Sequence, residues 1–298
     1  MPSAVTIPSG GEQLAGYLYR PEGEGDAPCV VMAHGFSATR DDGLPPYAEA
    51  FQAAGLAVVL FDYRHLGASS GEPRQLIDVR KQHDDYRAAV AFARALDGVD
   101  PDRIALWGTS FSGGHVVSVA ASDPRIAAVV AQCPFTDGIP VLLNVPPRNI
   151  LRGTLTGLRD QVGALAGRKP VLMPAVNPPG GFAAMTAPEA APGFAGLVGD
   201  GSLWRNAFAA RQMLTLPLYR PVAKVGRLQM PLLVCVCDGD ETTLPKPAVK
   251  LGERAPRGEI KHYPHGHFDI YHDEAARQDQ VEFLTRHLLR VPAVTANT

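Results

Sequence analysis

The 298-residue sequence has no long apolar run, no block of like charge and few cysteines. No apolar run is long enough to span a bilayer, so we expect no membrane span. Residues 1–5 lack a charged segment followed by an apolar core, and we expect no signal peptide. Charged residues make up only 19% of the chain, and the formal net charge is −2. Without a run of Lys or Arg, the sequence gives no sign of a nucleic-acid-binding or membrane-binding patch.

The four cysteines, Cys29, Cys133, Cys235 and Cys237, each lie in an apolar, strand-like run. Cys235 and Cys237 would share one face of a strand, but a C-x-C pair without further ligands is a weak metal signal. We interpret all four as buried, reduced thiols that act as small hydrophobic side chains. The cysteines therefore indicate a cytoplasmic protein and no metal site.

Hydrophobic residues make up 46% of the chain, enough for a large core. Continuous apolar runs, which are typical of parallel strands buried on both faces, alternate with helical patterns. This alternation predicts an α/β fold with a mostly parallel central sheet and helices on both faces. In such sheets the functional residues lie at the carboxyl ends of the strands. The expected strands are 5–7, 14–19, 29–33, 56–61, 104–107, 126–133, 232–237 and 259–263, and the expected helices are 44–54, 78–96, 113–121, 246–254 and 274–289.

Residues 134–226 interrupt this alternation, with 12 of the 27 prolines and 12 of the 30 glycines. We predict one helix after Pro147, with an apolar stripe from Leu151 to Leu165, and a second helix after Ser202. A long apolar insertion at a strand end is typical of a lid. We therefore predict a core domain of residues 1–133 and 227–298 and a partly helical lid of residues 134–226.

Two alternatives for this insertion stay open. It could be a linker between two domains, although both flanking segments are predicted to belong to one sheet. Its apolar surface could also form a homodimer contact instead of a lid, and the sequence does not determine the oligomeric state. Trp204 and Phe208 are candidate substrate-binding residues that could equally pack inside the lid.

A candidate nucleophile follows the expected strand at 104–107, in the pentapeptide Gly108-Thr109-Ser110-Phe111-Ser112. In a G-x-S-x-G nucleophile elbow, a sharp strand-to-helix turn exposes the serine Oγ, and the crowded backbone requires small neighbours. The usual glycine at the fifth position is Ser112 here. The alternative is that the glycines only mark a turn and that Ser110 is the N-cap of the following helix.

A nucleophilic serine needs a base, and the base needs an orienting carboxylate. The expected strand 232–237 leads directly into Asp238, Asp240 and Glu241, and the expected strand 259–263 leads into His265 and His267. Serine, acid and histidine thus follow one another in the order that this type of sheet requires. The sequence predicts a Ser/His/Asp hydrolase.

At this point the chain resembles the α/β-hydrolase superfamily, and within it the small bacterial serine esterases and dienelactone-hydrolase-like proteins. The motifs that carry the resemblance are spread over nearly the whole chain outside the insertion. They are His34-Gly35-Phe36, Asp62-Tyr63-Arg64-His65-Leu66-Gly67-Ala68-Ser69-Ser70-Gly71, Gly108–Gly113, Asp240-Glu241-Thr242-Thr243-Leu244-Pro245 and Gly266-His267-Phe268-Asp269-Ile270-Tyr271.

This resemblance implies roles for individual residues. It implies that Ser110 is the nucleophile, and it favours Asp240 over Asp238 as the acid and His267 over His265 as the base. It implies an oxyanion hole made by the backbone N–H groups of Phe36 and Phe111. It also implies that Asp62 and Arg64 brace a loop rather than react.

We therefore expect hydrolysis of carboxylic esters or related activated acyl compounds through an acyl-enzyme on Ser110. The substrate would be a small acyl compound, and no cofactor is needed. Thioesters, lactones, carbon–carbon bonds and acyl transfer remain open with the same residues. The alternative from another class is a ligand-binding protein that keeps the fold without turnover.

Overall fold

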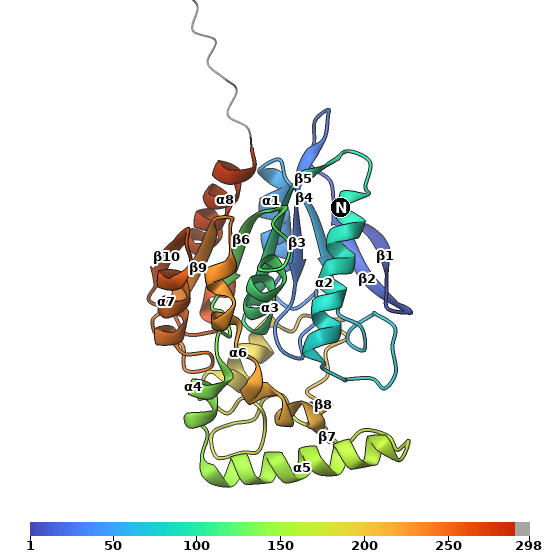
Figure 1. Ribbon diagram of the computed structural model, residues 1–298, viewed down its shortest axis with the longest axis vertical. Helices are drawn as coiled ribbons and strands as arrows, with labels where there is room; N and C mark the ends of the chain where they lie inside the picture. The colour runs from blue at the N-terminus through green and yellow to red at the C-terminus, as the bar shows by residue number, and fades with distance from the viewer. Residues whose placement is uncertain (290–298) are drawn as a thin grey trace, which may run out of the picture.

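The structure, a computed structural model, describes residues 1–289 and is built around one eight-stranded sheet (Figure 1). The strands lie in the order β1-β2-β4-β3-β5-β6-β9-β10. β1 and β2 are antiparallel to their neighbours, and the remaining strands are parallel. The strands are β1 Ser3–Ser9, β2 Glu12–Tyr19, β3 Ala27–Ala33, β4 Ala57–Phe61, β5 Val99–Thr109, β6 Ile126–Gln132, β9 Leu232–Cys237 and β10 Gly258–Tyr263. The predicted α/β fold is confirmed.

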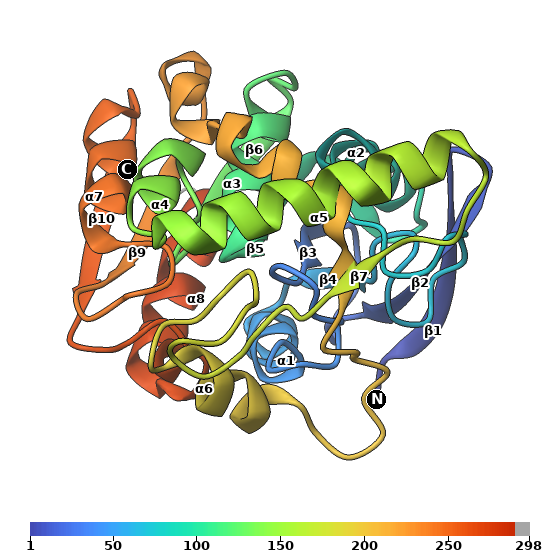
Figure 2. The ribbon, with the colours of Figure 1, turned by 90° about the horizontal axis from the view of Figure 1, so that it is seen from below.

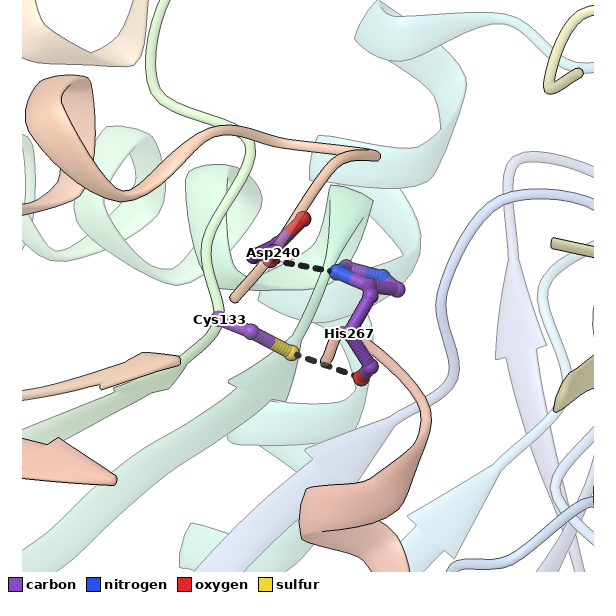
Figure 3. Close-up of side chains that lie close together, drawn as sticks. All are labelled: Cys133, Asp240 and His267. Atoms are coloured by element: carbon purple, nitrogen blue, oxygen red, sulfur yellow. Dashed lines mark hydrogen bonds and ion pairs between the residues drawn. The ribbon is translucent and has the colours of Figure 1, made fainter. Parts of the chain in front are cut away.

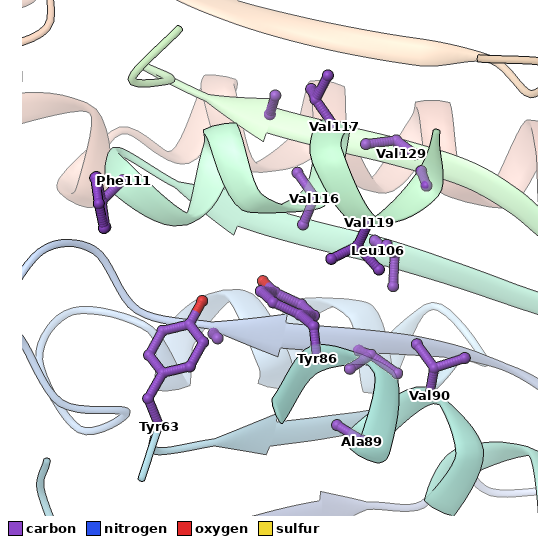
Figure 4. Packing of buried hydrophobic residues seen from close by; sticks show 14 of the residues in the cluster. Tyr63, Tyr86, Ala89, Val90, Leu106, Phe111, Val116, Val117, Val119 and Val129 are labelled. Atoms are coloured by element: carbon purple, nitrogen blue, oxygen red, sulfur yellow. The ribbon is translucent and has the colours of Figure 1, made fainter. Parts of the chain in front are cut away.

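Helices cover both faces of this sheet, which explains why its central strands are continuous apolar runs. α1 (Pro45–Ala53) and α8 (Glu274–Leu288) pack on one face, and α2 (Val79–Arg94), α3 (Phe111–Ala120) and α7 (Pro245–Arg254) pack on the other. Figure 4 shows Tyr86 and Val90 of α2 and Val116 of α3 packed over Leu106 of β5. The Asp78 side chain caps α2 by accepting hydrogen bonds from two backbone N–H groups of its first turn.

The insertion lies between β6 and β9, which are hydrogen-bonded neighbours in the sheet. The segments on either side of it therefore belong to the same sheet. The insertion lies beyond one end of the sheet in Figure 1, and Figure 2 shows its long helix α5 crossing in front of the strands. Its elements are α4 Gly138–Leu143, α5 Pro147–Leu165, β7 Leu172–Met173, α6 Ala190–Leu197, β8 Phe208–Ala209 and the 3₁₀ turns Ala210–Leu214, Leu216–Leu218, Pro221–Ala223 and Val225–Arg227.

The helix predicted after Ser202 is wrong. This segment pairs with distant parts of the chain instead, because Ala209 N–H donates to the Gln75 carbonyl and Ala210 N–H donates to the Val171 carbonyl. A backbone that is satisfied by other segments does not need helical hydrogen bonds. The sequence analysis also missed α4 and α6, two short helices that contain proline or the pair Pro192-Gly193. Within residues 1–289, no helix combines the length and the apolar character that crossing a membrane requires.

Candidate active site

Ser110 lies on the sharp turn between β5 and α3, with φ of 56° and ψ of −119°. This conformation is strained for a residue other than glycine. The turn is held by the neighbouring strand, since Ser110 N–H donates to the Gln132 carbonyl at 2.9 Å. Gly108 is required here because a Cβ atom at its position would collide with the Ser112 carbonyl oxygen. Ser110 makes no side-chain cap to α3, so the N-cap interpretation of this serine does not hold.

The Ser110 side chain instead begins a series of hydrogen bonds that connects three strand ends. Its Oγ lies 3.0 Å from Nε2 of His267, and Nδ1 of His267 lies 2.7 Å from Oδ2 of Asp240. All three residues are buried. The structure thus brings together the serine, histidine and aspartate that the sequence predicted, in bonding order.

The Asp240 carboxylate is held by its own loop. Its Oδ1 accepts from the backbone N–H groups of Thr242 and Thr243, and its Oδ2 accepts from the Thr243 hydroxyl. Burial raises the pKa of Asp240, but the contact with His267 and the hydrogen bonds from Thr243 outweigh this effect and lower it. Burial lowers the pKa of His267, but the Asp240 carboxylate and Cys133 together raise it by more. The pair therefore favours an ionised carboxylate beside a basic imidazole.

The other candidate acid and base lie elsewhere. Asp238 is exposed and pairs with His262 at 2.7 Å, and His265 pairs with Asp273 at 2.6 Å. Asp62 accepts from the backbone N–H groups of Arg40 and Ala68. Asp62 thus braces a loop, in agreement with what the resemblance implies, and Arg64 does the same through its salt bridge to Asp85.

The loop after β3 passes directly beside the nucleophile. A Cβ atom on Gly35 would lie 3.1 Å from the Ser110 Cβ, which explains a glycine at this position. The rings of Phe36 and Phe111 meet edge to face at 5.4 Å. His34 is fully buried, and its Nδ1 donates to the Gly35 carbonyl at 2.9 Å. Burial lowers the pKa of His34 to about 4, so this ring is neutral and structural.

Ser112, which replaces the usual glycine, connects this loop to the nucleophile turn. Its hydroxyl donates to the His34 carbonyl at 2.7 Å and also contacts the Tyr63 hydroxyl. All three residues are buried. A serine is accommodated here because its hydroxyl has polar partners on two other segments.

A cavity of about 470 Å³ opens beside Ser110, between the sheet and the insertion. Its walls are mainly apolar and include Phe36, Phe111, Phe135 and Val145. Trp204 and Phe208 do not line it. Phe208 is fully buried and packs edge to face on Phe36, whereas Trp204 stacks on Phe194 inside the insertion.

Cys133 lies beside His267, as Figure 3 shows. Its Sγ donates to the His267 carbonyl at 3.8 Å. Among residues 1–289, Cys133, Asp240 and His267 are the one set of three potential metal ligands whose ligand atoms lie within 4.8 Å of one another. The Asp240 and His267 side chains already bind each other, so an ion would have to break that hydrogen bond. The four cysteines are free and buried, as the sequence indicates.

Sequence reasoning missed Glu189, a residue of the insertion that connects to both loops of the site. Its Oε1 accepts from Glu241 N–H at 2.9 Å and from the Thr242 hydroxyl at 3.0 Å. Its Oε2 accepts from His267 N–H at 2.7 Å. One carboxylate therefore fastens the Asp240 loop, the His267 loop and the insertion together. No local sequence signal could have identified it, because its partners, two backbone N–H groups and one hydroxyl, lie more than 50 residues along the chain.

Comparisons with known proteins agree with this architecture. Residues 10–143 match the family described as X-Pro dipeptidyl-peptidase (S15 family). The chain is 44% identical to the quorum-quenching protein AidA of Acinetobacter baumannii over 288 residues, which covers 96% of this chain and 95% of AidA. The α/β hydrolase GrgF from Penicillium superimposes with a TM-score of 0.82 at 25% identity, covering 97% of this chain and 99% of GrgF. The chain belongs to the α/β-hydrolase superfamily. The predicted superfamily is therefore confirmed.

A further relative of this α/β hydrolase is similar over only part of the chain, and its name describes a different activity. Thiohydrolase aneE of Aspergillus aculeatus is 44% identical over 127 residues, which cover 43% of this chain and 39% of aneE. The relatives of this α/β hydrolase thus carry different activities in their names, and its substrate has to be inferred from its own site.

We predict that Glu189→Ala lowers kcat about 10- to 100-fold and changes KM little, because a small displacement of His267 misaligns the site. Glu189→Gln should behave similarly, since an amide cannot accept all three hydrogen bonds. Steady-state kinetics with an ester substrate measures both effects. Asp200→Asn, which alters another carboxylate of the insertion, is the matched control. A wild-type kcat in Glu189→Ala would contradict this role, and partial rescue by Glu189→Asp would support it.

Proposed function

We propose that this α/β hydrolase is a serine hydrolase that cleaves carboxylic esters and related activated acyl compounds through an acyl-enzyme on Ser110. The observation that carries the proposal is the hydrogen-bonded series of Ser110, His267 and Asp240. Ser110 and Asp240 both line an apolar cavity large enough for a small-molecule acyl substrate. A binding protein without turnover would not need this series.

In the proposed mechanism, Ser110 Oγ attacks the acyl carbon while His267 Nε2 takes its proton. The Asp240 carboxylate holds Nδ1–H of the ring and stabilises the imidazolium. The N–H groups of Phe36 and Phe111 bind the oxyanion. His267 then returns the proton to the leaving group, and water attacks the acyl-enzyme with the same histidine as base. No step requires a cofactor or a metal ion.

The insertion of residues 134–226 serves as the lid of this site in our proposal. It supplies cavity residues such as Val145 and Met185, and Glu189 fastens it to the loops of Asp240 and His267. Trp204 and Phe208 act indirectly. Phe208 supports the cavity wall through Phe36, and Trp204 fixes α6 through Phe194.

A lactone or a thioester with an apolar acyl group is the second candidate substrate. The similarity to a quorum-quenching protein over nearly the whole chain favours a lactone, because acylated lactones are common bacterial signals. The shorter similarity to a thiohydrolase favours a thioester. Both bonds are cleaved by the same serine chemistry as a carboxylic ester.

The proposed function predicts that Ser110→Ala abolishes hydrolysis of p-nitrophenyl esters and labelling by a fluorophosphonate. The wild-type protein should gain one adduct mass on Ser110 in intact-mass spectrometry. Ser118→Ala, which changes another buried serine, is the control and should still be labelled. Labelling that persists in Ser110→Ala, or a wild-type protein that binds acyl compounds without turnover, would refute the proposal.

A further prediction concerns the length of the acyl group and the type of bond that is cleaved. Over a series of p-nitrophenyl esters, kcat/KM should rise with chain length until the cavity of about 470 Å³ is filled, and then fall. Each buried methylene contributes about 0.8 kcal/mol, or roughly four-fold in kcat/KM. Acyl homoserine lactones and acyl thioesters of the best chain length then identify the preferred bond. A flat profile would contradict binding of the acyl chain in this cavity.

The proposed mechanism also predicts how the activity depends on pH. The reaction needs a neutral His267. Burial lowers the pKa of this histidine, but the Asp240 carboxylate and Cys133 together raise it well above its ordinary value of 6.5. Activity should therefore be lost as the pH falls through that raised pKa, and kcat/KM should still be rising with pH at neutrality.

Asp240→Asn removes the charge that raises the pKa of His267, so the histidine should titrate at lower pH, as NMR of the imidazole would measure. The plateau rate should fall about 10⁴-fold, the loss typical when a triad aspartate becomes asparagine. Asp238→Asn is the matched control, because Asp238 pairs with His262 outside the series. An unchanged His267 titration in Asp240→Asn would disprove the assignment of the acid.

A further inference from the structure

The outer face of α5 carries an apolar stripe with no partner within residues 1–289. Ten of the twelve exposed large hydrophobic residues in this part of the chain lie in the insertion, and half of those ten are on α5. They are Leu151, Leu155, Leu158, Val162 and Leu165, which follow one another at alternating steps of four and three residues. Steps of this kind place all five on one side of the helix.

The opposite side of α5 faces the protein. Gly153, Gly157 and Asp160 are the buried residues of the helix. A Cβ atom on Gly157 would lie 3.0 Å from the Ala210 carbonyl oxygen, and Asp160 forms a salt bridge with Arg211 at 2.7 Å. The helix is thus already anchored by its glycine side. The apolar stripe points into solvent, with exposures that range from 47% for Leu158 to 81% for Leu165.

The charge around this stripe is of one sign. Arg148, Arg152 and Arg159 lie along one flank at helical spacing, and Arg168 and Lys169 follow the helix end. Asp160, the one acidic residue of α5, is buried and bound to Arg211. Residues 134–226 hold nine Lys or Arg against four Asp or Glu, although the whole chain holds 28 against 30. Lys and Arg are no denser here than elsewhere, but acidic residues are scarce, so the insertion carries a net positive charge while the rest of the chain is net negative. The cations of α5 are spread by helical spacing rather than gathered in a run.

We propose that the outer face of α5 docks on an anionic lipid bilayer. A helix with an apolar face beside arginines is the form that lies in the interface of a membrane, with its leucines in the acyl boundary and its cations at the headgroups. A second copy of this chain fits the charge less well, because pairing two α5 faces would bring arginines together. Val145 and Pro146, which line the cavity, directly precede α5, so docking places the cavity next to the lipid surface.

Vesicle sedimentation with the full-length protein tests this docking without relying on the role of Ser110. The protein should bind vesicles of phosphatidylcholine with about 30 mol% phosphatidylglycerol, bind pure phosphatidylcholine much less, and dissociate as NaCl rises. Leu155→Ser/Val162→Ser should weaken binding at least about ten-fold. Arg148→Gln/Arg159→Gln should weaken it about 25-fold, or roughly five-fold per charge.

Lys250→Gln/Arg254→Gln, which removes two exposed charges from α7, is the matched control and should bind like the wild type. Circular dichroism melting checks that each variant is folded, and the arginine pair tests the proposal even if the apolar pair does not fold. Failure of the folded wild-type protein to bind anionic vesicles would overturn the proposal. So would a dimer in analytical ultracentrifugation that Leu155→Ser/Val162→Ser separates into monomers, because the stripe would then be an interface between copies.

Discussion

The backbone conformation of Ser110 is the constraint on which the rest of the site depends. A positive φ at a residue with a side chain costs about 1–3 kcal/mol, so the surroundings must hold it in place. Gln132 at the end of β6 accepts the Ser110 N–H, and Phe135 N–H donates to the Ser110 carbonyl. The strand next to the nucleophile and the first residues of the insertion thus fix the turn. As a result, the Ser110 Oγ makes no cap to the helix and lies within hydrogen-bonding distance of His267.

The insertion is part of this arrangement rather than an appendage to it. Glu189 contacts the backbone of both loops that carry the imidazole and the carboxylate. If the insertion moved away, three hydrogen-bond donors near the site would lose a charged acceptor, which is costly for partly buried groups. The positions of Asp240 and His267 therefore depend on the position of the insertion. The same segment encloses the cavity, so substrate access and alignment of the site depend on one structural element.

The sequence could predict those features that depend on local pattern. Continuous apolar runs identified the parallel strands, and the residues that end them include Ser110, Asp240 and His267, because parallel strands bring their carboxyl ends to one edge. It could not predict contacts between segments that are distant in sequence. Glu189 has no motif, and the segment after Ser202 has helical spacing but satisfies its backbone through Gln75 and Val171. The spacing of Leu151 to Leu165 indicated α5, but spacing alone does not say whether the leucines or the glycines face the core.

Ser112 shows how a departure from a common pattern is compensated. Glycine is usual at this position because the turn is crowded, and a buried hydroxyl without partners would cost more than about 1 kcal/mol. Here the hydroxyl donates to the His34 carbonyl and contacts Tyr63, so the added atoms are satisfied and connect the nucleophile turn to the loop of Phe36. Because Phe36 and Ser110 both line the cavity, this connection fixes the distance between the two segments on which an acyl group would react. The serine replaces the flexibility of a glycine with a fixed contact between the turn and that loop.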